Sequence, residues 1–319
     1  MNIFYKNFYS QIFSIILFLS VIFYGEKSHS SQDIWFIDLQ CVSWNCASCS
    51  NFEKISYFQL DDEGKWRHSD AVTFYETVSP DIPLIFFTPG YTSTSEDTVN
   101  AGMNLARLCG NEHPYRLVLW NWPAKRVYPG LAEDIRAKIP VAAASGLYMA
   151  MFLKKLPPKS QVSLYSFSFG ARVVCDAVES LGDSRPEGMR ISLVLSAAAT
   201  DYFWLSENGR HLNVPRLIDR ALILCNMHDR ALRFYPLLYG DGSRPDALGR
   251  FGAPRCAISP EYRGKFESVD VGIYVGAQHK TQLHMDTPAF RQRIGKYLFF
   301  DETILPVSAC EPVRGTENL

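Results

Sequence analysis

Short apolar runs alternate with longer segments of helical periodicity from about residue 80 onward. The runs are rich in β-branched and aromatic residues, which favours buried strands, and the segments between them favour helices. This alternation is typical of the α/β class, in which a mostly parallel, doubly wound sheet is covered by helices on both faces. We predict strands at Pro83–Thr88, Arg116–Trp120, Val162–Tyr165, Ile191–Ser196, Ala221–Asn226 and Val269–Val275, and helices at Glu96–Leu108, Val141–Lys155, Gly170–Leu181 and Ala289–Leu298.

Further strands precede this pattern at Ile34–Asp38 and Ser56–Gln59, and another extended segment begins at Trp66. We expect them to form an antiparallel edge of the same sheet. Two long polar connections, Thr200–Arg216 and Tyr239–Gly264, follow predicted strands at their carboxyl ends. Ligands bind at this edge of open α/β sheets, so these connections are expected to shape a pocket.

The first thirty residues differ from the rest of the chain. Lys6 precedes an apolar stretch, Ile12–Gly25, that is short for a membrane span, and Ser28 and Ser30 offer small residues at the positions a signal peptidase recognises. We interpret residues 1–30 as a signal peptide, 31–303 as one α/β domain and 304–319 as a C-terminal tail. The protein is then exported, to the periplasm or the medium. The alternative is an uncleaved membrane anchor, because the aromatic flank Phe4, Tyr5, Phe8 and Tyr9 lengthens the apolar segment.

The composition fits a single globular domain. The 319 residues are 47% hydrophobic, enough for a large core, and the formal net charge is -1. Because no excess of positive charge is present to attract phosphates, nucleic acid is not expected as a partner. Membrane contact is expected only through the N-terminal segment.

Eight cysteines are present, all after the predicted signal peptide. In an exported protein disulfides are the default use of cysteine. Cys41, Cys46 and Cys49 lie close together in CVSWNCASC, where structural disulfides are favoured over half a zinc site or a redox pair, since no second CxxC or close histidine pair follows. Cys175 and Cys225 are expected to be small buried apolar residues.

The segment VSLYSFSFGARVV runs from an apolar strand through a tight turn into a helix. This order is typical of a nucleophile elbow, in which a serine sits on a strained turn at the carboxyl edge of the sheet. Ser168 is the candidate nucleophile, and the small residues Ser166 and Gly170 suit the close packing around such a turn. An ordinary turn with a serine cap is the alternative interpretation.

A serine nucleophile requires a base, and the base requires an acid that holds its tautomer. Asp229 and His279 each follow a predicted strand, in the order Ser, Asp, His. Taken singly, Asp229 could be a helix N-cap and His279 a surface residue, but their joint order favours a triad. His284 is the rival base.

Other acidic and basic residues compete less well for these roles. Asp201 is the rival acid, because it follows the strand that ends at Ser196. His228 adjoins Asp229 but is expected to point elsewhere.

The oxyanion of a tetrahedral intermediate needs two backbone donors. One is the N–H of Phe169, the residue after the nucleophile, and the other is expected from the loop TPGYTSTSED. There Gly90 permits a sharp turn and Tyr91 supplies the N–H, while Pro89 has none.

With these segments together, roughly residues 33–300 resemble the α/β-hydrolase superfamily, and more closely a bacterial branch with a Ser-Asp-His triad. The resemblance rests on the following motifs: TPGYTSTSED, VLWNWPAKRV, YSFSFGARV, NMHDRALRFYPLLY with ALGRFGAP, and VDVGIYVGAQH. It implies an α/β-hydrolase fold with Ser168 as nucleophile, Asp229 as acid and His279 as base. Relatives usually carry histidine where this chain has Pro89, glycine where it has Ser166, and an aromatic residue where it has His284.

The expected function is serine-dependent acyl hydrolysis of the esterase, lipase or thioesterase type, on a small-molecule or lipid-like acyl substrate. No metal and no organic cofactor is required. Two alternatives remain: a hydrolase-fold binding or scaffolding protein whose activity has lapsed, and a redox or zinc module built on Cys46 and Cys49. Several aromatic residues are candidates either for an acyl pocket or for the core: Trp120, Trp122, Tyr202, Phe203 and Trp204.

Overall fold

The computed structural model describes residues 33–40, 54–238 and 245–301. The predicted signal peptide, the CVSWNCASC cysteines and the C-terminal tail lie outside these residues. Within the described residues, nine strands form one sheet: β1 (Asp33–Asp38), β2 (Ser56–Leu60), β3 (Trp66–Ser69), β4 (Leu84–Thr88), β5 (Arg116–Asn121), β6 (Gln161–Phe167), β7 (Arg190–Ser196), β8 (Arg220–Cys225) and β9 (Phe266–Asp270).

The strand order across the sheet is β3-β2-β1-β5-β4-β6-β7-β8-β9. All neighbouring pairs from β1 to β9 are parallel, whereas β2 and β3 add an antiparallel edge beside β1. Strand β6 therefore lies near the middle of the sheet, between β4 and β7. The residue that follows β6 is thus surrounded by the loops that follow β4 and β7.

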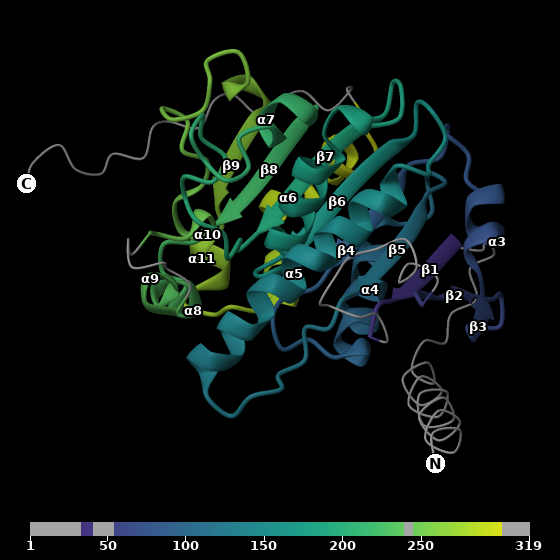
Figure 1. The fold of residues 1–319 in the computed structure, drawn as a ribbon, viewed down its shortest axis with the longest axis horizontal. Helices are drawn as coiled ribbons and strands as arrows, with labels where there is room; N and C mark the ends of the chain where they lie inside the picture. Colours follow the sequence, from purple (N-terminus) through teal and green to yellow (C-terminus); the bar gives the residue numbers. More distant parts are fainter. Residues whose placement is uncertain (1–32, 41–53, 239–244, 302–319) are drawn as a thin grey trace, which may run out of the picture.

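Helices cover both faces of this sheet (Figure 1), where α5 and α6 lie in front and the yellow C-terminal helices lie behind. The helices are α3 (Ala71–Glu76), α4 (Ser95–Cys109), α5 (Leu131–Leu153), α6 (Gly170–Leu181), α7 (Val214–Leu217), α8 (Arg230–Arg233), α9 (Tyr235–Leu238), α10 (Leu248–Phe251), α11 (Gly272–Val275), α12 (Thr281–Met285), α13 (Pro288–Arg291) and α14 (Ile294–Leu298), with single 3-10 turns at Gly182–Ser184 and Arg263–Lys265. The predicted α/β class, with a mostly parallel sheet covered by helices on both faces, is confirmed. None of the described helices combines the length and apolar character needed to cross a bilayer.

Two hydrophobic clusters separate along the faces of the sheet because successive strand residues point to opposite sides. Phe86 of β4 belongs to the cluster beneath α5 and α6, and its neighbour Phe87 belongs to the cluster beneath α4 and the C-terminal helices. Every residue of β4 is buried, as expected of a central parallel strand with both faces covered. The continuous apolar runs of the sequence follow from this double covering.

The last strand differs from the prediction of Val269–Val275. Strand β9 begins and ends earlier, and the predicted apolar end is the short helix α11, whose Ile273 is 86% exposed. Asp270 turns the chain at this point, because its Oδ1 accepts a hydrogen bond from the backbone N–H of Gly272 (2.7 Å). The prediction of a strand through Val275 is wrong, because the apolar residues GIYV form α11.

Two predicted helices also differ in extent. Helix α5 begins ten residues before the predicted Val141 and continues through Pro140, held by the buried Ile135 in its first part. The predicted helix Ala289–Leu298 is two helices, α13 and α14. Arg293 lies between them, and its guanidinium donates hydrogen bonds to the Ala289 carbonyl (2.9 Å) and to the Glu267 carboxylate (2.6 Å). The side chain thus caps the first helix and ties it to β9.

Candidate active site

Ser168 stands on a strained turn between β6 and α6. Its φ of 52° lies in the left-handed region, which costs a residue other than glycine about 1–3 kcal/mol. Three backbone hydrogen bonds hold this conformation: Ser168 N–H donates to the Ser196 carbonyl (2.9 Å), and the Ser168 carbonyl accepts from Ala171 (3.1 Å) and Ala199 (3.0 Å). The turn has the strand, strained serine and helix of a nucleophile elbow.

The elbow requires a glycine two residues after the serine. A Cβ at Gly170 would lie 2.5 Å from the Thr88 carbonyl oxygen and 2.6 Å from that of Pro89, so no larger residue fits without moving the backbone. The position two residues before the serine is less restricted. Ser166 occupies it fully buried, and its hydroxyl donates to the Val194 carbonyl (3.3 Å). The departure from glycine at that position therefore leaves the turn intact.

The structure brings Ser168, His279 and Asp229 together, as the sequence predicts. His279 Nε2 lies 2.7 Å from Ser168 Oγ, and His279 Nδ1 lies 2.6 Å from Asp229 Oδ2. Asp229 is fully buried, and its other oxygen, Oδ1, accepts the backbone N–H of Leu232 (3.0 Å) at the start of α8. One oxygen of this aspartate therefore caps the helix, and the other contacts the imidazole of His279.

His279 lies in the loop between α11 and α12, not directly after a strand. Its ring packs 4.9 Å from that of Phe167, centroid to centroid. The loop is tied to the segment after β8, because Asn226 donates its side-chain amide to the Gly276 carbonyl (2.7 Å) and Arg230 N–H donates to the Ala277 carbonyl (3.3 Å). These bonds fix the position of His279 beside Asp229.

His284, the rival base, lies on α12 and is fully buried, with its ring 5.6 Å from that of Phe167. Neither ring nitrogen has a hydrogen-bond partner among the described residues. Burial, together with the nearby His279, lowers the pKa of His284 to about 4. The hydrogen bond to Ser168 is made by His279.

The other rivals lie outside the hydrogen-bonded chain of Ser168, His279 and Asp229. Asp201 pairs with Ala247 in an isolated bridge and accepts the Phe203 N–H (3.0 Å). His228 donates its backbone N–H to the side chain of Asn226 (2.9 Å) and is exposed.

The buried neutral His284 predicts a loss of stability in acid. The unfolded chain takes up a proton near the ordinary value of 6.5, whereas the folded protein does so near 4, so stability falls as the pH drops between these values. Replacing His284 by phenylalanine is expected to remove about 3 kcal/mol of this pH dependence between pH 7 and pH 4. Urea unfolding of both proteins at the two pH values measures it. An unchanged dependence would contradict a neutral buried His284.

The two predicted oxyanion donors lie on segments that pack around Ser168. Phe169 directly follows the serine, and a Cβ on Gly90 would lie 3.1 Å from Ser168 Cβ, which places the peptide leading to Tyr91 beside Ser168. Trp122 braces both segments: its Nε1 donates to the Pro89 carbonyl (2.9 Å), and its ring stacks on Phe169 at 5.8 Å. Sequence reasoning missed this role, which the tryptophan-rich VLWNWPAKRV could have suggested.

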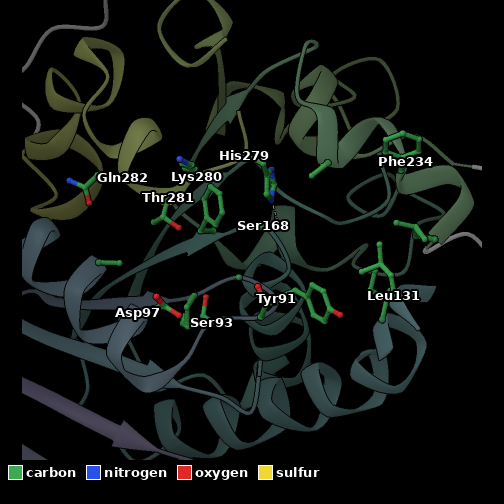
Figure 2. A pocket seen from close by; sticks show the side chains of 18 of the residues that line it. Tyr91, Ser93, Asp97, Leu131, Ser168, Phe234, His279, Lys280, Thr281 and Gln282 are labelled. Atoms are coloured by element: carbon green, nitrogen blue, oxygen red, sulfur yellow. Dashed lines mark hydrogen bonds between the residues drawn. The ribbon is translucent and has the colours of Figure 1, made fainter. Parts of the chain in front are cut away.

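A pocket of about 830 Å³ opens over Ser168 (Figure 2). It lies between the loop after β4, the helices α4, α5, α8 and α9, and the segment after His279. None of the aromatic candidates named from the sequence lines it: Trp120 and Trp122 are buried in the core, and Phe203 is 55% exposed elsewhere. The connection Thr200–Arg216 also does not line this pocket. It packs on α6 instead, where His211 Nε2 lies 2.8 Å from Asp176 Oδ1.

The four cysteines within the described residues are all free thiols. Cys175 and Cys225 are buried, as predicted. The described parts of the chain hold no group of three or more histidine, cysteine, aspartate or glutamate side chains arranged to bind a metal ion. The candidate zinc or redox residues Cys46 and Cys49 lie outside the described residues.

No protein-family model and no curated protein matches this chain. Among solved structures, a sugar hydrolase (YeeB) from Lactococcus lactis is similar, with 13% identity, a TM-score of 0.34, and coverage of 77% of this chain and 90% of that chain. A bifunctional GH43-CE protein of Bacteroides eggerthii is also similar, with 12% identity and a TM-score of 0.36. The alignment covers 82% of this chain but only 38% of that protein.

Proposed function

We propose that this protein is a serine hydrolase that cleaves ester-type bonds by acyl transfer. The observation that carries the proposal is the continuous chain of short contacts from Ser168 Oγ to His279 and on to the buried Asp229. A hydroxyl on a strained turn, within hydrogen-bond reach of an oriented histidine and open to a pocket, is the arrangement that nucleophilic catalysis by serine needs.

In the proposed reaction, Ser168 Oγ attacks the carbonyl carbon of the substrate while His279 Nε2 takes the serine proton. Asp229 holds the imidazole in the required tautomer and stabilises it when it is protonated. The backbone N–H groups of Tyr91 and Phe169 bind the oxyanion. The intermediate collapses as His279 gives its proton to the leaving oxygen, and a water molecule, activated by His279, then releases the acid from Ser168. This sequence of steps uses no metal and no organic cofactor.

Labelling with a fluorophosphonate tests the proposal without knowledge of the substrate. We expect native protein to react and tryptic peptide mass spectrometry to place the adduct on Ser168, because only an activated serine attacks this phosphorus centre at a useful rate. Heat-denatured protein is the control and should remain unlabelled. A native protein that does not react would favour the alternative of a hydrolase-fold binding protein whose activity has lapsed.

We further propose that the protein is exported, on the basis of its N-terminal apolar segment. Because the predicted cleavage site follows Ser30, the mature protein from its host should begin near Ser31. N-terminal sequencing tests this part, and recovery of Met1 in the membrane fraction would favour a retained anchor.

A further inference from the structure

The pocket over Ser168 has two arms of opposite chemistry, and the serine and His279 lie between them (Figure 2). Figure 2 shows Leu131 and Phe234 on one side, and Asp97, Lys280, Thr281 and Gln282 on the other. We call these sides the apolar arm and the polar arm. The apolar arm consists of Leu131, Ile135, Ala231, Phe234, Leu237 and Leu238, and the polar arm of Ser93, Asp97, Asn100, Lys280, Thr281 and Gln282.

The apolar arm is built where α5 packs against α9 and α9 packs against α8. Its members carry hydrocarbon side chains only. Three of them leave much of their surface in water, with exposed fractions of 47% for Leu131, 55% for Phe234 and 65% for Leu237. Covering such surface with a hydrocarbon chain is favourable by about 25 cal/mol per Å². The arm therefore favours a flexible apolar group of the substrate.

The polar arm is built where α4 packs against α12. Asp97 is held in place because its Oδ2 accepts hydrogen bonds from the N–H (2.9 Å) and the hydroxyl (2.8 Å) of Thr94. The arm combines this carboxylate with the ammonium group of Lys280, two side-chain amides and two hydroxyls. Because the two formal charges cancel and both donors and acceptors are present, a neutral group with several hydroxyls fits better than an ionic one.

We propose that the substrate is an ester between an apolar acyl chain and an alcohol with several hydroxyl groups, with the acyl chain in the apolar arm and the alcohol in the polar arm. This inference rests on the proposed function. Ser168 Oγ first bonds to the acyl carbon, and the ester C–O bond breaks when the tetrahedral intermediate collapses and the alcohol oxygen receives the proton carried by His279. Water then cleaves the acyl-enzyme, which yields the free acid and regenerates the serine.

The acyl chain is tested with p-nitrophenyl esters from acetate to decanoate. We expect kcat/KM to rise by about fourfold per added methylene until the arm is filled. Leu237→Asn should make kcat/KM rise less steeply with chain length, because it makes the arm polar. Leu212→Asn is the matched control, because Leu212 is also largely exposed (49%) but does not line the pocket. A series that is flat in the unmodified protein, or equally steep in Leu237→Asn, would overturn the assignment of this arm.

The alcohol is tested by comparing glycerol monodecanoate with ethyl decanoate. We expect the glycerol ester to have the higher kcat/KM, and Gln282→Leu to lower this preference by about two- to tenfold through the loss of a hydrogen bond. Gln292→Leu is the matched control, because Gln292 is exposed at the end of α13 and does not line the pocket. No preference for the glycerol ester, or a preference that Gln282→Leu leaves unchanged, would overturn the assignment of the polar arm to the alcohol.

The lifetime of the decanoyl-enzyme decides which arm holds the acyl group, because the alcohol has already left that species. We expect Leu237→Asn to change the rate of deacylation and Gln282→Leu to leave it unchanged, as followed by intact-protein mass spectrometry after quenching. The opposite pattern would mean that the acyl group lies in the polar arm and would overturn the proposed orientation.

Fluorophosphonate labelling of Ser168 does not depend on either arm. A labelled protein that fails these tests therefore rejects the substrate class alone, and an unlabelled one rejects the proposed function.

Discussion

Replacement of Ser168 by alanine is expected to lower kcat for an activated ester such as p-nitrophenyl acetate by roughly four to six powers of ten. The reason is that the substitution removes the oxygen that forms the covalent bond, while His279 and Asp229 keep their positions. Because nucleophile and base act as one unit, little of the rate survives the loss of either. Steady-state hydrolysis and fluorophosphonate labelling of the same preparation measure the effect.

Two serines of the same strand serve as controls for this variant. Ser163 donates its hydroxyl to the Tyr297 and Leu298 carbonyls (3.0 Å each), and Ser166 donates to the Val194 carbonyl. Both are fully buried, so neither hydroxyl is open to a substrate. Ser163→Ala and Ser166→Ala should therefore retain labelling. Persistent labelling of Ser168→Ala would reject Ser168 as the nucleophile.

Replacement of His279 by alanine is expected to abolish turnover to a similar degree, because the serine then has no base within reach. His284→Ala should retain at least about a tenth of the activity, a loss of no more than about 1.4 kcal/mol in the activation barrier. The difference follows from the contacts: His279 Nε2 lies 2.7 Å from Ser168 Oγ, while His284 packs behind Phe167 with no hydrogen bond to a described residue.

Initial rates with an activated ester, measured for both histidine variants at equal concentrations of folded protein, test this distinction. Circular dichroism and the urea midpoint identify any variant that has lost its fold, which matters most for the buried His284. If His284→Ala were folded but inactive and His279→Ala were active, the base would be His284 and not His279.

Local sequence signals determined much of the fold and pointed to the candidate site. Continuous apolar runs indicated the central strands, since parallel strands covered on both faces have no polar side, and the predicted helix Gly170–Leu181 agrees with α6. The strand, serine, glycine and helix of YSFSFGARV depend on neighbours in the chain, so Ser168 could be named from sequence. Asp229 and His279 were selected because each follows a predicted strand and the carboxyl ends of parallel strands meet at one edge of the sheet, although a short helix separates His279 from β9.

Only the tertiary structure decided the features that depend on residues far apart in the chain. The strand predicted at Val269–Val275 ends at Asp270 instead, because that carboxylate turns the chain into α11, and His279 is held by bonds to the segment after β8. The bracing of the Pro89 loop by Trp122 joins residues 33 positions apart. Part of the pocket wall comes from the short helices α8 and α9, whose periodicity is too brief to be recognised, and the aromatic residues that the sequence offered do not line it. The sequence by itself therefore determined most of the sheet and the candidate site residues, because these follow from local pattern and strand order. The walls of the pocket depend on how helices pack across the sheet edge, and that packing has no local signal.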